Sequence, residues 1–262
     1  MKLFVVHKDT VIIYFLILAA ICSVLTLNWD TTSAVFETMA PKKDLPIYCV
    51  QKEEKICAIS FDAAWGNEDT HTLVEILKKY NVKTTFFVVG GWVDKYPESV
   101  KELSDAGHEI MNHSNTHPHM TKLSKEQMQK EVTECNDKIE KVTNKKPILF
   151  RPPYGDYNDS VVSAMRDIGM YTIQWDVDSL DWKDLAPETI IDRVTTKVKP
   201  GSIVLFHNAA KNTPAALPKI LEKLIADGYK IVPVSELIYK ENFSVDVSGK
   251  QIPNTVSTGS ID

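Results

Sequence analysis

Short apolar runs rich in β-branched residues recur along most of the chain, and amphipathic segments separate them. The apolar runs lie at residues 56–61, 84–89, 109–111, 148–150, 170–175, 202–206 and 229–232. Segments with the helical period of apolar positions fill the intervals, at residues 70–80, 97–106, 125–142, 160–168, 187–198 and 215–226. Strands that alternate with helices at this spacing predict a parallel sheet with right-handed crossover connections.

Residues typical of helix ends support these boundaries. Ser124 and Thr213 are candidate N-caps, and Gly107, Gly169 and Gly228 are candidate stops.

Polar residues lie at or just past the ends of five of the apolar runs, namely Asp62, His113, Arg151, Asp178 and His207. An open doubly wound sheet would gather its site at one switch point, and it would usually show a glycine-rich turn after the first strand, where this chain has none. A closed barrel instead places its chemistry at the C-terminal ends of several strands. We therefore predict an α/β fold, an irregular (β/α) barrel of about seven parallel strands.

The N-terminal part of the chain has the pattern of a membrane anchor. Lys2 and Lys8 lie in residues 1–10, and residues 11–27 are an uncharged stretch of 17 residues. That length is at the short end of the roughly 17 to 25 residues that cross a bilayer. A cleaved secretory signal is the alternative, but Pro41 follows the best cleavage site and disfavours cutting. We predict an uncleaved N-terminal transmembrane helix.

Charge orients this anchor and limits the partners of the rest of the chain. Lysines precede the apolar stretch and acidic residues follow it, which predicts a cytoplasmic N-terminus and a cell-membrane protein with its domain outside the cytoplasm. The formal net charge is -5 and no basic stripe is present, which argues against nucleic acid as a partner. No protein partner is predicted.

Composition divides the remaining chain into three parts. Residues 28–44 are of mixed polarity and are expected to form a linker, and residues 45–240 are expected to fold as one domain. Residues 241–262 are polar and lack periodicity, so we expect a disordered tail. Cys49 and Cys57 flank Lys52-Glu53-Glu54, and a hairpin with this three-residue loop would bring them within disulfide distance; the alternative is two small strand residues.

Two histidines provide a candidate metal site. His113 and His117 are four residues apart, directly after an apolar run. Two neutral imidazoles on one face of a turn can bind one divalent ion, and chance matches to this spacing, with histidines that are only solvated or capping, are the alternative. A metal there could polarise a carbonyl oxygen and lower the pKa of a bound water toward about 7, which suits hydrolysis of an amide or ester.

Four further residues could complete such a site. Asp62 is suited to act as the base for the water and His207 as the acid for the leaving nitrogen. Arg151 could pair with Asp62, and Asp181 could hold His207 protonated. The alternative for Arg151 and Asp181 is a structural ion pair between two loops.

Five short motifs together resemble those of the polysaccharide deacetylase family, also called carbohydrate esterase family 4 or the NodB-homology domain. In chain order they are Ser60-Phe61-Asp62, the His113 to His117 pair, Arg151-Pro152-Pro153-Tyr154-Gly155, Asp178-Ser179-Leu180-Asp181-Trp182 and Leu205-Phe206-His207. The resemblance covers about Lys55 to Ile238 and implies a deformed (β/α) barrel. It also implies removal of acetyl groups from N-acetylated sugars in peptidoglycan, chitin or a related glycan, with a divalent metal, usually Zn²⁺.

The resemblance assigns a role to each matching residue. It implies Asp62 as the general base, Arg151 as its partner, His113 and His117 as metal ligands, His207 as the acid and Asp181 as the partner of His207. It further implies that the Tyr154 backbone N–H completes an oxyanion hole and that Leu205 and Trp182 enclose the acetyl methyl group. Trp65 and Tyr154 are candidates for stacking on a sugar ring, with packing as the alternative.

The chain departs from the family pattern at Ala63. The family usually has a second aspartate here, which is a metal ligand, and alanine cannot ligate. Either Asn67, Glu68 or Asp69 substitutes, or the metal binds loosely, or the protein is an inefficient enzyme. The variant Phe-Asp-Ala-Ala-Trp-Gly, with the anchor, resembles the sporulation-associated subfamily and implies a role in spore cell-wall formation or maintenance.

Two functions therefore compete. A metal-dependent deacetylase is favoured by the retention of Asp62, Arg151, Asp181 and His207, because binding alone needs no acid, base or orienting partners. A glycan-binding protein that keeps the barrel groove without turnover is favoured by Ala63.

The charge pattern around the anchor predicts the topology. Protease added to intact protoplasts should digest the domain, because lysines before the span and acidic residues after it place the domain outside. Protection of the domain, while a known external protein is cleaved, would reverse the proposed orientation.

Overall fold

The computed structural model describes residues 14, 15, 17, 18 and 43–254, and the chain divides into two units, Met1–Lys43 and Asp44–Asp262. Within the predicted anchor, residues 14, 15, 17 and 18 are helical with exposed side chains. The rest of that anchor and residues 28–42 of the predicted linker lie outside the described residues. None of the described helices combines the length and the apolar character that spanning a membrane requires.

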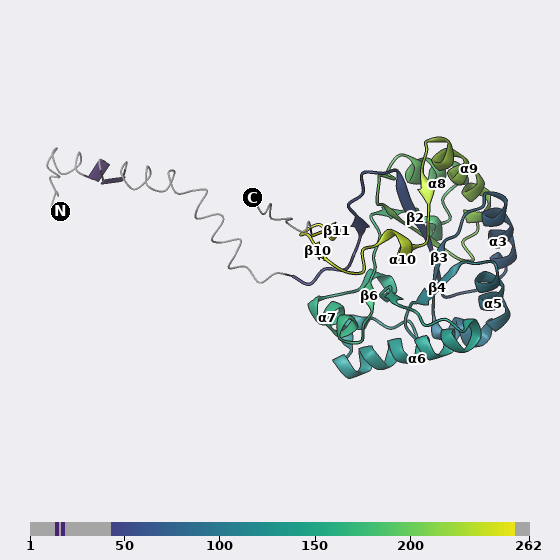
Figure 1. Cartoon of the computed structure of the whole chain (residues 1–262), viewed down its shortest axis with the longest axis horizontal. Coiled ribbons are helices and arrows are strands. Elements are labelled where there is room, and N and C mark those ends of the chain that lie inside the picture. The colour runs from purple at the N-terminus through teal and green to yellow at the C-terminus, as the bar shows by residue number, and fades with distance from the viewer. Residues whose placement is uncertain (1–13, 16, 19–42, 255–262) are drawn as a thin grey trace, which may run out of the picture. The chain divides into compact units, whose positions relative to one another are not determined.

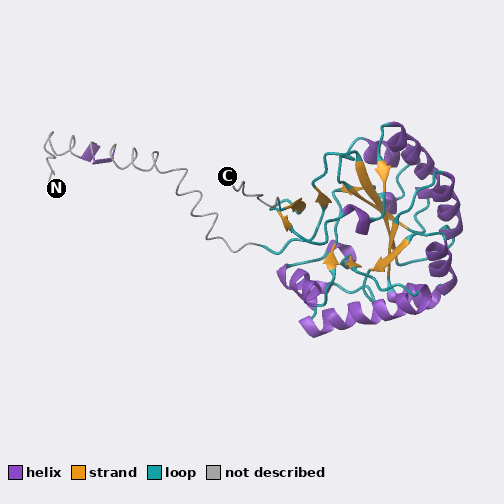
Figure 2. Ribbon diagram, in the orientation of Figure 1, coloured by secondary structure: helices purple, strands orange, loops and turns teal. Residues whose placement is uncertain are grey.

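The second unit is built on a curved sheet of parallel strands that forms an incomplete barrel (Figures 1 and 2). The order is β6-β5-β4-β3-β2-β8-β7, and β9 pairs with the start of β2. The strands are β2 (Ile56–Ala63), β3 (Thr85–Val88), β4 (Glu109–Asn112), β5 (Leu149–Phe150), β6 (Tyr171–Thr172), β7 (Val177–Asp178), β8 (Ile203–His207) and β9 (Lys230–Ile231). Each of the seven predicted runs contains a strand. β7 is additional, and two residues are too few to show a period.

Helices surround the strands on the outside (Figure 1). The six predicted helices are present as α3 (Thr70–Lys79), α5 (Pro97–Asp105), α6 (Lys125–Thr143), α7 (Asp159–Asp167), α8 (Pro187–Thr195) and α9 (Thr213–Ala226). The short α4 (Gly90–Lys95) and α10 (Val234–Leu237) were not predicted, and neither were the 3-10 turns η1 (Met120–Lys122), η2 (Pro153–Gly155) and η3 (Asp181–Lys183). All five span six residues or fewer, which is too short for an amphipathic signal.

The helix-end signals are confirmed with one exception. Ser124 caps α6 through a capping box with Gln127, and all three predicted glycine stops have positive φ. Thr213 is not a cap, because Asn212 precedes the helix and the Thr213 hydroxyl donates to Asp181 instead. The tertiary contact to a buried carboxylate replaces the local capping bond.

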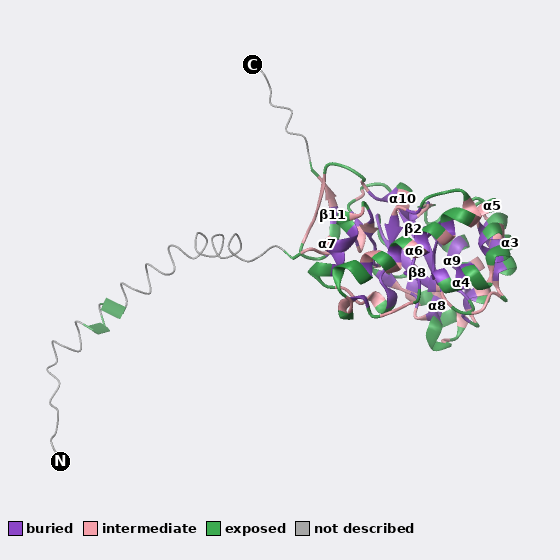
Figure 3. Cartoon of the chain, turned by 90° about the horizontal axis from the view of Figure 1, so that it is seen from below, coloured by how far each residue is buried: buried purple, intermediate pink, exposed green. Residues whose placement is uncertain are grey.

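The alternation of side chains along β2 separates the core from the functional face. Phe61 and Ala63 pack into the cluster under the helices, and Phe61 stacks on Phe86 and Phe206 at ring-centroid distances of 4.8 and 5.5 Å. Figure 3 shows these central strands as the buried part of the unit. Asp62 therefore points to the other side of the strand, and it lies in register with His207 of β8.

The predicted hairpin that would bring two cysteines together does not form. Cys49 lies in β1 (Cys49–Val50), which pairs in parallel with β11 (Lys250–Pro253), whereas Cys57 lies in β2 opposite Ile231 of β9. Both thiols are free. Since the two cysteines pair with different strands, the reading as two small strand residues is the correct one.

The predicted tail is ordered over most of its length, so the expectation of disorder is wrong for residues 241–254. Strands β10 (Phe243–Val245) and β11 form an antiparallel pair that joins β1 in a three-stranded sheet. Gln251 is fully buried, and its side-chain amide accepts from Tyr239 N and donates to Tyr239 O at 2.8 and 2.6 Å. Polar composition did not mean exposure here, because the backbone satisfies the buried amide. Residues 255–262 lie outside the described part.

Gln251→Ala should lower the free energy of unfolding by about 1–3 kcal/mol, because it leaves two backbone groups of Tyr239 without their partner. Chemical denaturation of both proteins would measure this. Lys250→Ala, at the exposed neighbouring position, is the control and should stay within about 0.5 kcal/mol of wild type. Equal stability of all three proteins would mean that β11 does not hold the end of the domain.

Candidate active site

A cavity of about 440 Å³ opens where the predicted site residues converge. Eight of the ten line it: Asp62, Trp65, His113, His117, Tyr154, Trp182, Leu205 and His207. The other two, Arg151 and Asp181, are fully buried behind the wall and contact two of the lining residues. The structure therefore brings together residues that lie up to 145 positions apart in sequence, from Asp62 to His207. This convergence follows from the parallel sheet, whose strands present their C-terminal ends at one edge.

Asp62 is held by a buried arginine. Arg151 Nη1 donates to Asp62 Oδ1 at 2.8 Å, and Nη2 donates to Ser60 Oγ at 2.9 Å. The guanidinium lies over the Phe87 ring at 4.1 Å. Burial alone would raise the pKa of Asp62, but the charge of Arg151 and its hydrogen bond hold the pKa below its usual value. Asp62 is therefore a carboxylate at neutral pH, with Oδ2 left facing the cavity.

The two predicted metal ligands lie side by side. His113 is buried, its Nδ1 donates to Arg151 O at 2.7 Å, and its Nε2 is 3.6 Å from Asp62 Oδ2. The ring centroids of His113 and His117 are 5.0 Å apart. Burial lowers the pKa of both histidines, to about 4 for His117. Both imidazoles are neutral at pH 7, as metal ligation requires.

Hydrogen bonding at His113 also fits a metal ligand. A ligating histidine usually donates its other ring N–H to a carbonyl or carboxylate, which fixes the tautomer. The bond from His113 Nδ1 to Arg151 O has this form, so the lone pair on Nε2 is the one available to a metal ion. His113 therefore has the hydrogen bonding that a metal ligand requires.

The third position has no counterpart. Ala63 is buried in the cluster under the helices, and the three predicted substitutes are engaged elsewhere. Asn67 donates to Ser99, Glu68 accepts from Asn67 N, and Asp69 accepts from Ala209 N. Across residues 43–254 and the four described residues of the first unit, no three His, Cys, Asp or Glu side chains form a group that could hold a metal ion. The carboxylate of Asp62 contacts His113, with Oδ2 3.6 Å from His113 Nε2.

His207, on β8 next to Asp62 of β2, is held by a second buried carboxylate, Asp181. Its Nδ1 lies 2.8 Å from Asp181 Oδ1, while Asp181 Oδ2 accepts from His207 N and from Thr213 Oγ1. Burial alone would lower the pKa of His207, but the hydrogen bond to Asp181 and the charges of Asp62 and Asp181 raise it above its ordinary value. His207 therefore keeps a proton at a pH where His113 has lost its own. The predicted contact of Asp181 with His207 is present, and Arg151 and Asp181 do not pair with each other.

Three exposed aromatic side chains form the rim of the cavity. Trp65, Tyr154 and Trp182 are 61%, 61% and 57% exposed. Tyr154 has φ of 60°, which is uncommon for a residue other than glycine, and its ring packs against His117 and His119 at 4.5 and 4.4 Å. Exposed rings at the mouth of a cavity suit stacking on a sugar. Packing alone, the alternative for Trp65 and Tyr154, does not account for this exposure.

Several supporting residues were missed by sequence reasoning. Glu131 of α6 accepts from Asn115 N, Thr116 N and Thr116 Oγ1 at 2.8 to 3.0 Å, so it fixes the loop between the two histidines. Asn208 accepts from Ala64 N and donates to Trp65 O, which anchors the loop after β2. Adjacency to His207 could have indicated Asn208. Nothing in the sequence indicated Glu131, whose contact depends on how α6 packs.

Comparison with known proteins agrees with this arrangement. A sequence model described as polysaccharide deacetylase matches residues 50–173. PdaC, a peptidoglycan-N-acetylmuramic acid deacetylase of Bacillus subtilis, is 38% identical over 188 residues, which are 72% of this chain and 40% of PdaC. A peptidoglycan-N-acetylglucosamine deacetylase of Bacillus cereus is 38% identical over 196 residues, 72% of this chain and 91% of that protein. The chain thus spans less than half the length of PdaC.

Similar solved structures include one that departs from the enzymes. BA3943 of Bacillus anthracis, a CE4 family pseudoenzyme, is 39% identical with a TM-score of 0.72, over 78% of this chain and 71% of BA3943. A mutant of BA3943 with restored enzymatic activity is 40% identical, also with a TM-score of 0.72, over 78% of this chain and 74% of the mutant. The fold of this chain is therefore shared by active and inactive proteins.

Asp181→Asn should lower the pKa of His207, because it removes the carboxylate that raises the pKa and leaves the burial that lowers it. NMR titration of the His207 ring would measure the change. Asp184→Asn, which neutralises an exposed carboxylate on the same segment, should leave the pKa as in wild type. A raised pKa retained in Asp181→Asn would show that Asp181 does not control the proton on His207.

Proposed function

Because the chain belongs to the polysaccharide deacetylase family, we propose that it removes N-acetyl groups from a cell-wall glycan of the peptidoglycan type. The observation that carries this proposal is a pair of groups in one cavity, on neighbouring strands, whose pKa values are shifted in opposite directions. The pKa of Asp62 is lowered beside Arg151, and the pKa of His207 is raised beside Asp181. Hydrolysis of an amide needs one group to take a proton and one to give a proton, and this site supplies both.

The proposed reaction assigns each proton to a named atom. Asp62 Oδ2 takes a proton from the attacking water, while Arg151 holds Oδ1 and keeps the carboxylate in place. The water oxygen forms a bond to the acetyl carbon, and the carbon–nitrogen bond breaks. Nε2 of His207 gives its proton to the leaving nitrogen, so the products are acetate and an amino sugar. The backbone N–H of Tyr154 is proposed to stabilise the oxyanion, and Leu205 and Trp182 to enclose the methyl group.

His113 and His117 are proposed to hold a divalent metal ion, with Zn²⁺ the ion that suits neutral imidazoles. When bound, the ion would polarise the acetyl carbonyl and lower the pKa of the water. A site with two imidazoles lacks the charge of a third, anionic ligand, so weak binding is expected. The short distance from His113 to Asp62 offers one way to compensate.

A second candidate function is glycan binding without turnover. The specific observations in its favour are Ala63, the missing third ligand among the described residues, and the similarity to BA3943, which is itself a pseudoenzyme. The pairs Asp62–Arg151 and His207–Asp181 favour the enzyme. Glycan binding alone does not require a histidine whose pKa is raised by a buried carboxylate.

The cellular setting is proposed from the sequence. An N-terminal anchor over residues 11–27 would hold the domain outside the cytoplasm, next to the cell wall. The subfamily resemblance of the segment around Ala63 supports a role in forming or maintaining the spore cell wall, in the forespore or spore envelope.

Acetate release from peptidoglycan, with Zn²⁺ added, tests the proposed enzyme directly. Release by wild type, with loss in His207→Ala, would support the deacetylase. Binding of the glycan without acetate release, at any metal concentration that leaves the protein folded, would instead establish the second candidate.

Asp62→Asn should lower turnover by about 10²- to 10⁴-fold, the contribution typical of a general base, while the shape of the cavity and glycan binding persist. Metal content, measured by elemental analysis, separates the two possible roles of Asp62. Full occupancy with lost turnover indicates the base, and joint loss of both indicates a recruited metal ligand. Unchanged acetate release would exclude Asp62 from the chemistry.

A further inference from the structure

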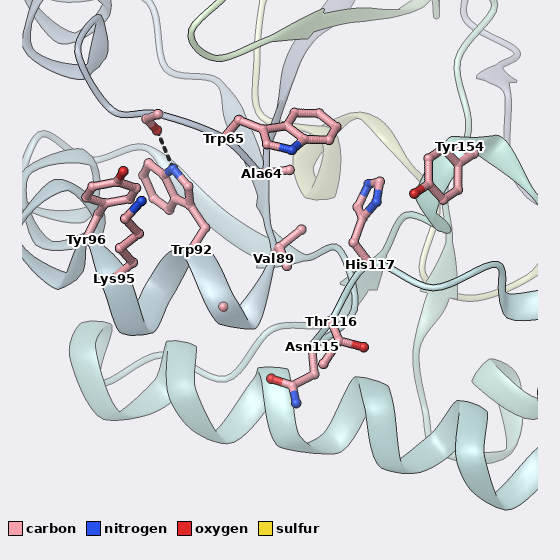
Figure 4. Close-up of a pocket in the computed structure, with 12 residues that line it drawn as sticks. Ala64, Trp65, Val89, Trp92, Lys95, Tyr96, Asn115, Thr116, His117 and Tyr154 are labelled. Carbon is pink, nitrogen blue, oxygen red and sulfur yellow. Dashed lines mark hydrogen bonds between the residues drawn. The ribbon is translucent and has the colours of Figure 1, made fainter.

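A second hollow of about 560 Å³ lies directly beside the catalytic cavity (Figure 4). The two share Ala64, Trp65, His117 and Tyr154 as lining residues. Figure 4 shows His117 and Tyr154 at one end of the hollow and Trp92, Lys95 and Tyr96 at the other. A polymer that has one sugar at His117 can therefore extend into this hollow without leaving the protein surface.

The wall next to Trp65 is fixed in place. Trp92 Nε1 donates to Gly66 O at 2.6 Å, and Asn208 Nδ2 donates to Trp65 O and Gly66 O. These bonds tie the loop after β2 to α4 and to the loop after β8. The backbone that carries the exposed Trp65 ring is thus held in place, and an aromatic face of this kind suits packing against a sugar ring.

Some polar side chains of the hollow are already engaged. Figure 4 shows Asn115 and Thr116 turned toward α6, where Thr116 donates to Glu131 and Asn115 bonds to Glu134 and Lys138. The amide and the hydroxyl are thus held by the protein itself. A ligand in this hollow would find aromatic faces, the hydroxyls of Tyr96 and Tyr154, the ring of His117, and one cationic group, Lys95.

Lys95 is the cation of the hollow. It is exposed, and its ammonium lies 5.0 Å from the centroid of the Tyr96 ring. Within the described residues no carboxylate lies within 4.0 Å of Lys95, whereas Lys138 nearby is neutralised by Asp94 at 2.6 Å. A positive charge at the end of an aromatic-walled hollow favours a ligand that carries an anion there.

We propose that this hollow is a subsite for an acidic sugar of the glycan strand, with Lys95 as the ion-pair partner of the sugar carboxylate. The proposal rests on the proposed function, which places the N-acetyl group of the same strand in the neighbouring cavity. N-Acetylmuramic acid carries a lactyl carboxylate and has this chemistry. Chitin, which has no carboxylate, would bring no anion to Lys95.

Calorimetric binding of three tetrasaccharides to the full chain tests the subsite. The first alternates N-acetylglucosamine and N-acetylmuramic acid with free lactyl carboxylates, the second is the same with the carboxylates converted to methyl amides, and the third is chitotetraose. We expect wild type to bind the first about 5- to 10-fold more tightly than the second, as one charge-assisted contact provides. This preference should shrink as salt is added.

Two substitutions and a control assign the preference to Lys95. Lys95→Met should abolish the preference for the free carboxylate without weakening the binding of chitotetraose, and Lys95→Arg should keep it. Lys101 is an exposed residue of α5 that lines neither cavity, so Lys101→Met should behave as wild type. A preference that survives in Lys95→Met, or that is missing in wild type, would overturn the subsite.

Acetate release from the same three compounds separates this proposal from the proposed function. Equal acetate release from all three compounds, unaffected by Lys95→Met, would support the deacetylase and refute the subsite. A Lys95-dependent preference in binding, without acetate release by wild type, would refute the deacetylase and support the subsite in a binding protein.

Discussion

The buried ion pair between Asp62 and Arg151 is the constraint on which the site depends. A guanidinium with no exposed surface needs a countercharge and hydrogen-bond partners, and Asp62, Ser60 and Gln174 O supply these to Nη1 and Nη2. Arg151 in turn presents its carbonyl to His113, so one residue orients both the proposed base and a proposed metal ligand. Removal of either charge would leave the other uncompensated in the barrel, at a cost of about 3–5 kcal/mol.

His207 is also positioned by a buried charged partner, in this case the carboxylate of Asp181. Asp181 is fully buried, and His207 and Thr213 satisfy its oxygens. A carboxylate placed in this way favours the protonated form of the imidazole, whereas Arg151 favours the ionised form of Asp62. The two pKa values move in opposite directions because the two buried partners carry opposite charge. This separation is the physical basis for assigning one proton acceptor and one proton donor.

Ala63 contributes packing and no ligand at the end of β2. It is buried under the helices, and of the acidic residues that follow it Glu68 accepts from Asn67 N and Asp69 from Ala209 N. The architecture around it depends on apolar contacts and on the ion pair of Arg151 with Asp62. The same fold is shared by the similar deacetylases and by a pseudoenzyme, so the fold by itself does not decide activity.

The alternation of strands and helices could be predicted from the amino-acid sequence, because the hydrophobic period is a local property. The placement of Asp62, His113 and His207 at strand ends followed from it, since parallel strands end at one edge. Other features depended on long-range packing. It ordered the polar segment around Gln251, separated the strands of the two cysteines, and used Glu131 to fix the histidine loop. These outcomes depend on which distant backbone groups need a partner, and no local pattern in the sequence encodes that need.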